Sequence, residues 1–260
     1  MSGEGRVADY DRIADRFDAR YGLYTYDGVR DTLLTFLGPE PGAVLEVGCG
    51  TGHWLAAVAL ARRGAEGAKT AGVDPSAPML ARARLAVPGA LLTRARAEHL
   101  PWRDATFDRI FCINALHHFA DRARFFTEAR RVLKPGGGLL SIGKDPHTDR
   151  DEWWVYEYFE ETRAIDRERF ARVRTLRGEM ALAGFAWTES KEADHIEAVH
   201  PAAEALVNGV VDTSFTSQLT VLTEEEFSRG ARRLRQANDA AGGDLQLVAD
   251  FRLYATIAWV

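Results

Sequence analysis

The chain has 260 residues, 46% of them hydrophobic, and a formal net charge of -5 at pH 7. This hydrophobic fraction excludes a disordered chain, and the acidic balance disfavours a nucleic-acid partner, which needs a concentrated basic surface. The densest basic run, 229–235, lies beside Glu224, Glu225 and Glu226. We interpret it as a solvated helix face.

Cysteine content and the N-terminal sequence limit the class of protein further. Cys49 and Cys112 both lie in stretches expected to belong to a buried parallel sheet, and their spacing predicts neither a disulfide framework nor a metal site. The opening sequence MSGEGRVADYDRIADRF lacks a basic region followed by an apolar run, and no stretch reaches eighteen apolar residues. We therefore expect no signal peptide, no membrane partner and a cytoplasmic location.

Between residues 44 and 134, short apolar runs alternate with helical patterns, as in parallel βαβ units. The expected strands are 44–48, 69–74, 91–94, 107–114 and 138–143. The expected helices are 52–64, 75–87 and 121–133. The sequence LKPGGG at 133–138 predicts a sharp break after the last of these helices, because proline cannot continue a helix.

After residue 145 the pattern becomes mostly helical. Segment 146–170 is aromatic and charged, a helix at 172–183 ends before Gly184, and 185–199 has a strand-like composition. Segment 201–245 predicts further helices, with Thr223 and Glu226 spaced as a capping box. Strict alternation of apolar side chains predicts a last strand in 250–260. We expect one α/β domain over 1–260, with its core at 40–145 and with 146–170 and 201–245 as a helical cap over the ligand site.

The segment VLEVGCGTG at 44–52 predicts a strand, a glycine turn and a helix. Gly48, Gly50 and Gly52 allow the backbone to approach a ligand without an intervening Cβ, and the turn aims the unpaired N–H groups of the next helix at that ligand. A dinucleotide fingerprint needs another glycine at position 53, which is His53. Asp74, at the end of the second strand, can accept both ribose hydroxyls of a nucleoside. Alternatively it caps the next helix.

Four motifs, VLEVGCGTG, VDPSAPML, AEHLPWRDATFDRIFCINALHHF and RVLKPGG, resemble in order and spacing the motif series of class I S-adenosylmethionine-dependent methyltransferases. The likeness is greatest to the branch of ubiquinone and menaquinone biosynthesis, and it covers 44–143 and, more loosely, 10–22. The resemblance implies a Rossmann-like three-layer sandwich. Its sheet has seven mostly parallel strands with the last one antiparallel, it carries a helical cap, and its cofactor is S-adenosylmethionine.

The resemblance also implies the cofactor-binding residues. The glycines cradle the methionyl part, Asp74 binds the ribose, and Met79 packs against adenine unless it serves only helix-to-sheet packing. Ala97 and Glu98 lie at the adenine edge. Arg96 stands where the family often has Asp or Asn, so either Glu98 or a water replaces that acceptor, or Arg96 points to solvent. The full expected set is Tyr10, Glu46, Gly48, Cys49, Gly50, Gly52, Asp74, Pro75, Met79, Arg96, Ala97, Glu98 and Asn114.

Two histidines are the candidate catalytic residues. Asn114, at the end of the fourth strand, is expected beside the reactive sulfonium, and His117 and His118 border the acceptor pocket. A histidine there can act as a general base, or it can pack or form a supporting hydrogen bond. Tyr10 is expected to close over the cofactor, or else to pack its helix on the core.

The aromatic run 153–159 occupies most faces of a helix, so we expect some of its rings in the core and others in a cavity for a planar or hydrophobic acceptor. The sequence thus predicts a methyltransferase, monomeric or homodimeric, for a small-molecule acceptor with an O, N or C nucleophile, in secondary metabolism and without a metal. The alternatives are a tRNA-modifying methyltransferase and a cofactor-binding partner subunit that transfers no methyl group.

Overall fold

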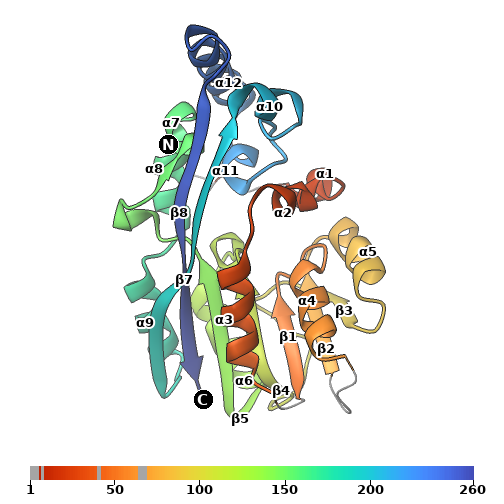
Figure 1. Ribbon diagram of the computed structural model, residues 1–260. Helices are drawn as coiled ribbons and strands as arrows, with labels where there is room; N and C mark the ends of the chain where they lie inside the picture. The colour runs from red at the N-terminus through yellow and green to blue at the C-terminus, as the bar shows by residue number, and fades with distance from the viewer. Residues whose placement is uncertain (1–5, 7–8, 40–41, 64–68) are drawn as a thin grey trace. The chain divides into compact units, whose positions relative to one another are not determined.

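The computed structural model describes residues 6, 9–39, 42–63 and 69–260 (Figure 1). The chain divides into two compact units. The core unit comprises Asp27–Lys144, Ala171–Asp194 and Leu253–Val260, and the second unit comprises Met1–Tyr26, Asp145–Phe170 and His195–Arg252. Both expected cap segments, 146–170 and 201–245, fall within the second unit. That they cover the ligand site stays a prediction.

A mostly parallel sheet forms the centre of the core unit. Its parallel strands are β1 (Ala43–Val47), β2 (Lys69–Asp74), β3 (Leu91–Arg94), β4 (Phe107–Ile113) and β5 (Leu133–Gly143). β8 (Gln246–Trp259) runs antiparallel to β5, and β7 (Trp187–Pro201) pairs with β8. The strand order is β3-β2-β1-β4-β5-β8, so the chain reverses direction across the sheet between β1 and β4. The predicted fold class, with its antiparallel last strand, is confirmed.

Helices cover both faces of this sheet. They are α3 (Asp27–Leu37), α4 (His53–Ala61), α5 (Ala77–Ala86), α6 (Arg122–Val132) and α9 (Val173–Leu182), with the short turn η2 (Leu116–His118) after β4. In Figure 1, α3 and α4 lie on the near side of the sheet and α6 lies behind it. The predicted helix 52–64 ends at Ala61 in the structure, and its last expected residue, 64, lies outside the described part.

Side-chain alternation explains the division of the core between the two faces. Leu45 and Val47 of β1 share a buried cluster with Phe125 and Phe126 of α6. Because successive strand residues point to opposite faces, Glu46 between them points toward the α4 side. One carboxylate is thus placed inside an otherwise apolar layer.

The segment LKPGGG departs from its prediction. β5 begins at Leu133, directly after α6, and not at residue 138. Phe107 of β4 pairs with Leu133, and Arg109 pairs with Gly138. More residues lie between the two partners on β5 than on β4, and these extra residues form an irregularity in a continuous strand, with Gly136 at φ +75°. Proline and glycine end the helix as expected, but the flanking strand pairs keep the segment in the sheet.

The second unit is mostly helical. Its elements are α1 (Tyr10–Ile13), η1 (Phe17–Ala19), α2 (Arg20–Leu23), η3 (Pro146–Thr148), β6 (Glu152–Trp153), α7 (Trp154–Tyr158), α8 (Glu161–Arg169), α10 (Ala202–Val207), α11 (Ser217–Thr220) and α12 (Glu224–Ala240), with the adjoining parts of β7 and β8. The two-residue β6, which pairs with β8, is a strand that the sequence did not predict, and it brings the sheet to eight strands. The capping box of Thr223 and Glu226 is confirmed.

The aromatic run 153–159 lies in the hydrophobic core of the second unit. Its five rings are at most 8% exposed: Trp153, Trp154, Tyr156, Tyr158 and Phe159. Both indole N–H groups donate to the Tyr24 hydroxyl, each at 3.3 Å. The structure therefore favours core packing for these rings over the expected division between core and cavity.

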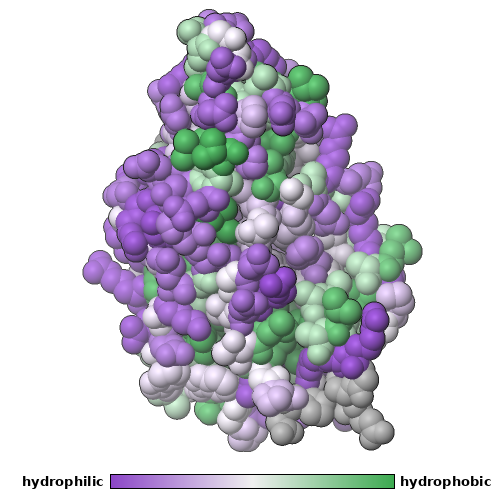
Figure 2. All heavy atoms as spheres, viewed as in Figure 1, coloured by the Kyte–Doolittle hydropathy of each residue, from purple (hydrophilic) through white to green (hydrophobic). Residues whose placement is uncertain are grey.

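The surface gives one more observation. On the face shown in Figure 2, hydrophobic surface is broken into separate patches with hydrophilic surface between them. Among the described residues, no helix is both long and apolar enough to cross a membrane.

Candidate active site

The carboxyl ends of four neighbouring strands carry the residues of interest. In open α/β sheets, ligands bind beyond these ends, where the strand order reverses. That point lies between β1 and β4. Gly48 follows β1, Asp74 ends β2, Asn114 follows β4 and Lys144 follows β5.

The glycine turn after β1 needs its three glycines for backbone conformation and for close packing. Gly48, Gly50 and Gly52 have φ values of +75°, +51° and +85°. A Cβ on Gly48 would lie 2.5 Å from the Ala115 Cβ, so the turn packs directly against the segment after β4. A Cβ on Gly52 would lie 3.2 Å from the Ala83 Cα, where α4 and α5 approach each other.

The N–H groups of the turn are mostly used within the protein. Those of Gly48 and Cys49 donate to the Val73 carbonyl at 2.8 and 3.1 Å. That of Gly50 donates to Asp74 Oδ2 at 2.9 Å, and that of Gly52 donates to the Cys49 carbonyl. These four N–H groups of the turn therefore stabilise its own conformation.

Glu46 is a buried acid beside the first turn of α4. Its side chain is 1% exposed and accepts the N–H of Leu55, while among the described residues no group donates to Oε2. Burial, together with the neighbouring charge of Asp74, raises the pKa of Glu46 well above its usual range. A dinucleotide-binding fold would use this helix N-terminus for a pyrophosphate. Glu46 instead places a carboxyl group there, whose Oε2 atom can accept a hydrogen bond.

Asp74 is anchored by the backbone on both oxygens. Oδ2 accepts the N–H of Gly50 and Oδ1 accepts the N–H of Ser76, both at 2.9 Å. Ser76, whose hydroxyl accepts the N–H of Met79, is the cap of α5, so the alternative role of Asp74 as that cap is wrong.

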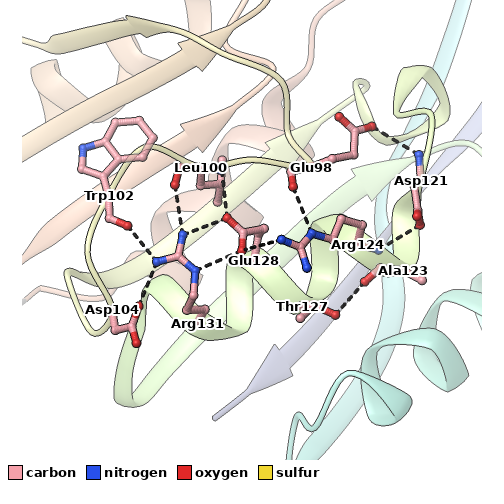
Figure 3. Close-up of polar contacts among 10 residues, drawn as sticks. All are labelled: Glu98, Leu100, Trp102, Asp104, Asp121, Ala123, Arg124, Thr127, Glu128 and Arg131. Carbon is pink, nitrogen blue, oxygen red and sulfur yellow. Dashed lines mark hydrogen bonds and ion pairs between the residues drawn. The ribbon is translucent and has the colours of Figure 1, made fainter.

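The expected adenine edge has a structural function of its own. The Arg96 side chain is 68% exposed, and its Nε atom lies 3.7 Å from Glu98 Oε2. Of the alternatives left open above, the structure favours the one in which Arg96 points to solvent. Glu98 Oε1 accepts the N–H group of Asp121, the N-cap residue of α6 (Figure 3), and also that of Ala120. Glu98 therefore fixes α6, and its other oxygen faces Arg96.

A second group of contacts, which the sequence analysis missed, holds the loop after Glu98. Glu128 Oε2 accepts the N–H of Leu100 at 3.0 Å and pairs with Arg131 at 2.8 Å (Figure 3). Arg131 also donates to the carbonyls of Leu100 and Trp102 and to Asp104. The hydrogen bonds from Arg131 hold the pKa of Glu128 below its usual range. Glu128 and Arg131 are spaced for an ion pair on one face of a helix, and this spacing can be recognised in the sequence. It does not reveal which loop residues the pair contacts.

Several expected cofactor residues are packed within the core unit. Met79 is 1% exposed and Ala97 is 6% exposed, whereas Pro75 lies at the surface, where its carbonyl accepts from Arg94. Cys49 is also buried, and a Cβ on Gly72 would lie 2.9 Å from its sulfur. Burial raises the pKa of the Cys49 thiol, so the side chain remains neutral.

The segment after β4 carries the candidate catalytic residues. Asn114 is exposed and has φ +51°, a left-handed conformation that is uncommon outside glycine and often marks functional sites. His117 and His118 lie in η2, with ring centroids 3.8 Å apart, and both are half-buried. The contact of Ala115 with Gly48 brings this segment beside the glycine turn. Tyr10 lies in the second unit, edge-on to Phe17, and its closure over the cofactor stays a prediction.

Among the described residues, the structure brings one group of possible metal ligands together. Ligand atoms of His195, Glu197 and Asp250 lie within 4.8 Å of one another, although Asp250 is far from the other two in sequence. His195 Nε2 lies 2.7 Å from Asp250 Oδ1, and Arg252 donates to the same oxygen at 3.1 Å. Because the guanidinium would repel a cation, we assign no metal to this group.

These features define a doubly wound α/β protein with two buried acidic residues near the carboxyl ends of β1 and β2. Residues 45–141 match the family described as "Methyltransferase domain". The demethylmenaquinone methyltransferase of Lactiplantibacillus plantarum is 39% identical over 143 residues, which make up 51% of this chain and 60% of that relative. The chain thus spans less than two thirds of the curated relatives that it matches. The predicted resemblance to class I methyltransferases of the ubiquinone and menaquinone type is confirmed.

Two solved structures share the fold over nearly the whole chain. One is a protein of Anabaena variabilis described as a candidate methyltransferase of an antibiotic biosynthesis pathway, with a TM-score of 0.64, 20% identity, and 98% and 99% coverage of the two chains. The other is phosphoethanolamine N-methyltransferase 2 of Haemonchus contortus in complex with S-adenosyl-L-methionine, with a TM-score of 0.61, 17% identity, and 97% and 60% coverage. At these identities the likeness shows the fold.

Proposed function

We propose that this chain binds S-adenosylmethionine at the ends of β1 and β2 and transfers its methyl group to a small molecule. The observation that carries this proposal is the pair of buried carboxyl groups, Glu46 and Asp74, around the glycine turn. Asp74 offers acceptors to ribose hydroxyls, and the Oε2 atom of Glu46 offers an acceptor to an ammonium group. These residues fit a cationic nucleoside and oppose a nucleotide phosphate.

Methyl transfer from a sulfonium requires few functions of the protein. When bound, S-adenosylmethionine supplies a methyl carbon that takes an electron pair from the acceptor, while the carbon–sulfur bond breaks and leaves its pair on a neutral sulfur. The chain must hold both partners in line, exclude water and keep the acceptor nucleophilic. We assign cofactor orientation to Asn114, and proton removal from a hydroxyl or acidic carbon to His117 or His118.

The acceptor is proposed only as a class. The relatives named for demethylmenaquinone match about half of this chain, so their acceptor is not carried over. A small molecule is favoured over RNA because the basic run 229–235 is partly neutralised. Arg229 pairs with Glu161 and Glu225, and Arg233 pairs with Glu160. Secondary metabolism, a cytoplasmic location and a monomer or homodimer stay predictions.

Calorimetry and methyl transfer test this proposal together. We expect S-adenosylhomocysteine to bind the purified chain, and labelled methyl from S-adenosylmethionine to enter a small-molecule extract. Transfer to bulk tRNA instead would support the tRNA-modifying alternative, and binding with no transfer would support a partner subunit. Absence of binding would overturn the proposal.

A further inference from the structure

Helices α4 and α5 form an outer layer of the core unit that the proposed function does not use. The chain passes from β1 through α4 to β2 and then through α5 to β3, and both connections move the same way across the sheet. Two right-handed crossovers of this kind place α4 and α5 on the same face. The helices are adjacent, because a Cβ on Gly52 at the start of α4 would lie 3.2 Å from the Ala83 Cα of α5.

The outer side of this layer exposes two leucines. Leu60 of α4 is 63% exposed and Leu85 of α5 is 83% exposed. In α5 the exposed residues lie opposite the buried Met79, Leu80 and Ala83. Hydrophobic surface lies over α4 and α5 on the right of Figure 2. The α4–α5 face is defined by six exposed residues: Leu60, Arg63, Ala81, Arg84, Leu85 and Ala86.

The α4–α5 face is positive in a chain that is negative overall. Between residues 48 and 97 the sequence has seven Arg or Lys residues and two acids, Glu66 and Asp74, whereas the whole chain has a net charge of -5. Asp74 is buried, and neither α4 nor α5 contains an acid. The arginines of α12, by contrast, pair with nearby glutamates. A single exposed leucine is common in folded proteins, but two of them on an acid-free cationic layer indicate a surface for contact.

The composition of the α4–α5 face favours one kind of partner. An RNA would use the arginines and leave the leucines in water. A second copy of the chain would use the leucines, but its two-fold symmetry would bring like charges together. An anionic lipid bilayer uses both, because its acyl region accepts leucine side chains and its phosphates attract arginines. The apolar stems of the arginines can lie beside the leucines while their charged ends stay at the phosphates.

We propose that the α4–α5 face binds reversibly to the surface of an anionic lipid bilayer. Its two leucines enter the headgroup region, and its two arginines contact lipid phosphates. The expectation of no membrane partner rested on the lack of a long apolar stretch, which peripheral binding does not require. The interaction does not involve the cofactor, so it can be tested apart from the proposed function.

Co-sedimentation of the whole chain with lipid vesicles tests this proposal. We expect binding to vesicles of phosphatidylcholine with about 30% phosphatidylglycerol, about tenfold weaker binding to pure phosphatidylcholine, and a loss of binding as salt is added. Leu85→Gln and Arg84→Gln should each weaken binding to the anionic vesicles about three- to tenfold. Both residues are exposed, so the melting temperature should stay unchanged.

Helix α9 provides matched controls. It packs with α6 through Met180, which shares a buried cluster with Phe125. Leu182 of α9 is 90% exposed, and Arg174 of the same helix is also exposed. Leu182→Gln and Arg174→Gln should therefore leave vesicle binding at the wild-type level.

Several results would overturn the membrane proposal. They are absence of binding to anionic vesicles, equal binding to both kinds of vesicle, and binding that neither Leu85→Gln nor Arg84→Gln weakens. Binding to total RNA without binding to vesicles, weakened by Arg84→Gln alone, would assign the face to RNA instead. A dimer that Leu85→Gln dissociates, again without vesicle binding, would assign it to a second copy of the chain. If vesicles bind and S-adenosylhomocysteine does not, the proposed function fails and this inference stands.

Discussion

Glu46 lies one residue before the end of β1 and Asp74 ends the neighbouring β2, yet the two acids have different surroundings. The carboxylate of Asp74 receives two backbone N–H groups. Glu46 receives one and is buried beside that charge, so its neutral form is favoured. The sequence identified both acids through the motif resemblance. It could not reveal this difference, which depends on the contacts with Leu55, Gly50 and Ser76.

Replacing Asp74 with Asn should weaken the binding of S-adenosylhomocysteine by about 1–3 kcal/mol, because hydrogen bonds to a charged group are lost. Calorimetry measures this change, and the melting temperature shows how much comes from the lost contacts with Gly50 and Ser76. Asp239→Asn, on the exposed face of α12, is the control. Unchanged affinity in a folded Asp74→Asn variant would remove Asp74 from the site.

Replacing Glu46 with Gln should stabilise the free protein at alkaline pH while weakening its affinity for the cofactor. A carboxyl group whose pKa is raised by folding contributes stability below its unfolded pKa and loses it as the pH rises through the folded value. Gln keeps an acceptor for the Leu55 N–H and cannot ionise, so its advantage in melting temperature should grow with pH. Equal melting temperatures for both proteins across the pH range would contradict a raised pKa.

At the scale of elements, local patterns predicted where most strands lie and missed long-range contacts. Strand 69–74 and strand 91–94 are found at their predicted bounds, because their apolar residues are flanked by clear breaks. The segment LKPGGG lies in β5 because its ends pair with Phe107 and Arg109 of β4, which no local pattern shows. The contacts of Glu128 with Leu100 could not be predicted for the same reason.

The Glu128 contacts lead to a prediction about the loop at the adenine edge. Glu128→Ala leaves the buried Leu100 N–H and the Arg131 guanidinium without this acceptor, which should lower the free energy of unfolding by about 1–3 kcal/mol. Hydrogen exchange in 98–104 should become faster. Glu128→Gln, which retains an acceptor, should lose less.

The pH dependence of this effect has a defined sign. The pKa of Glu128 is lowered by folding, so its contribution is present above the ordinary value of 4.5 and is lost as the pH falls through the folded value. The difference in stability between wild type and Glu128→Gln should therefore shrink in acid. A difference that grows as the pH falls below 4.5 would contradict the ion pair with Arg131 as its cause.

At the scale of the whole molecule, the sequence predicted the core unit far better than the second unit. Residues 44–143 contain a motif series whose order and spacing predict the strand topology. Segments 146–170 and 201–245 contain no such motifs, and their composition predicts only that they are helical. The five rings of 153–159 are buried because residues from distant segments, such as Tyr24, Phe215 and Phe251, contact them. Such partners cannot be identified from periodicity within one helix.

Because Trp154 is buried, a substitution there can distinguish between the two roles considered for this aromatic run, core packing and lining of the acceptor site. Trp154 is 1% exposed and packs near Phe159 and Phe215, so Trp154→Ala should lower the free energy of unfolding by about 3–5 kcal/mol. Hydrogen exchange should become faster across the second unit. The affinity for S-adenosylhomocysteine should change less than twofold, because all expected cofactor residues except Tyr10 lie in the core unit. Trp187→Ala, at a tryptophan that is 52% exposed on β7, is the matched control and should change stability by less than about 0.5 kcal/mol. If Trp154→Ala instead kept its melting temperature and lost methyl transfer to the extract, the ring would line the acceptor site and the core assignment would be wrong.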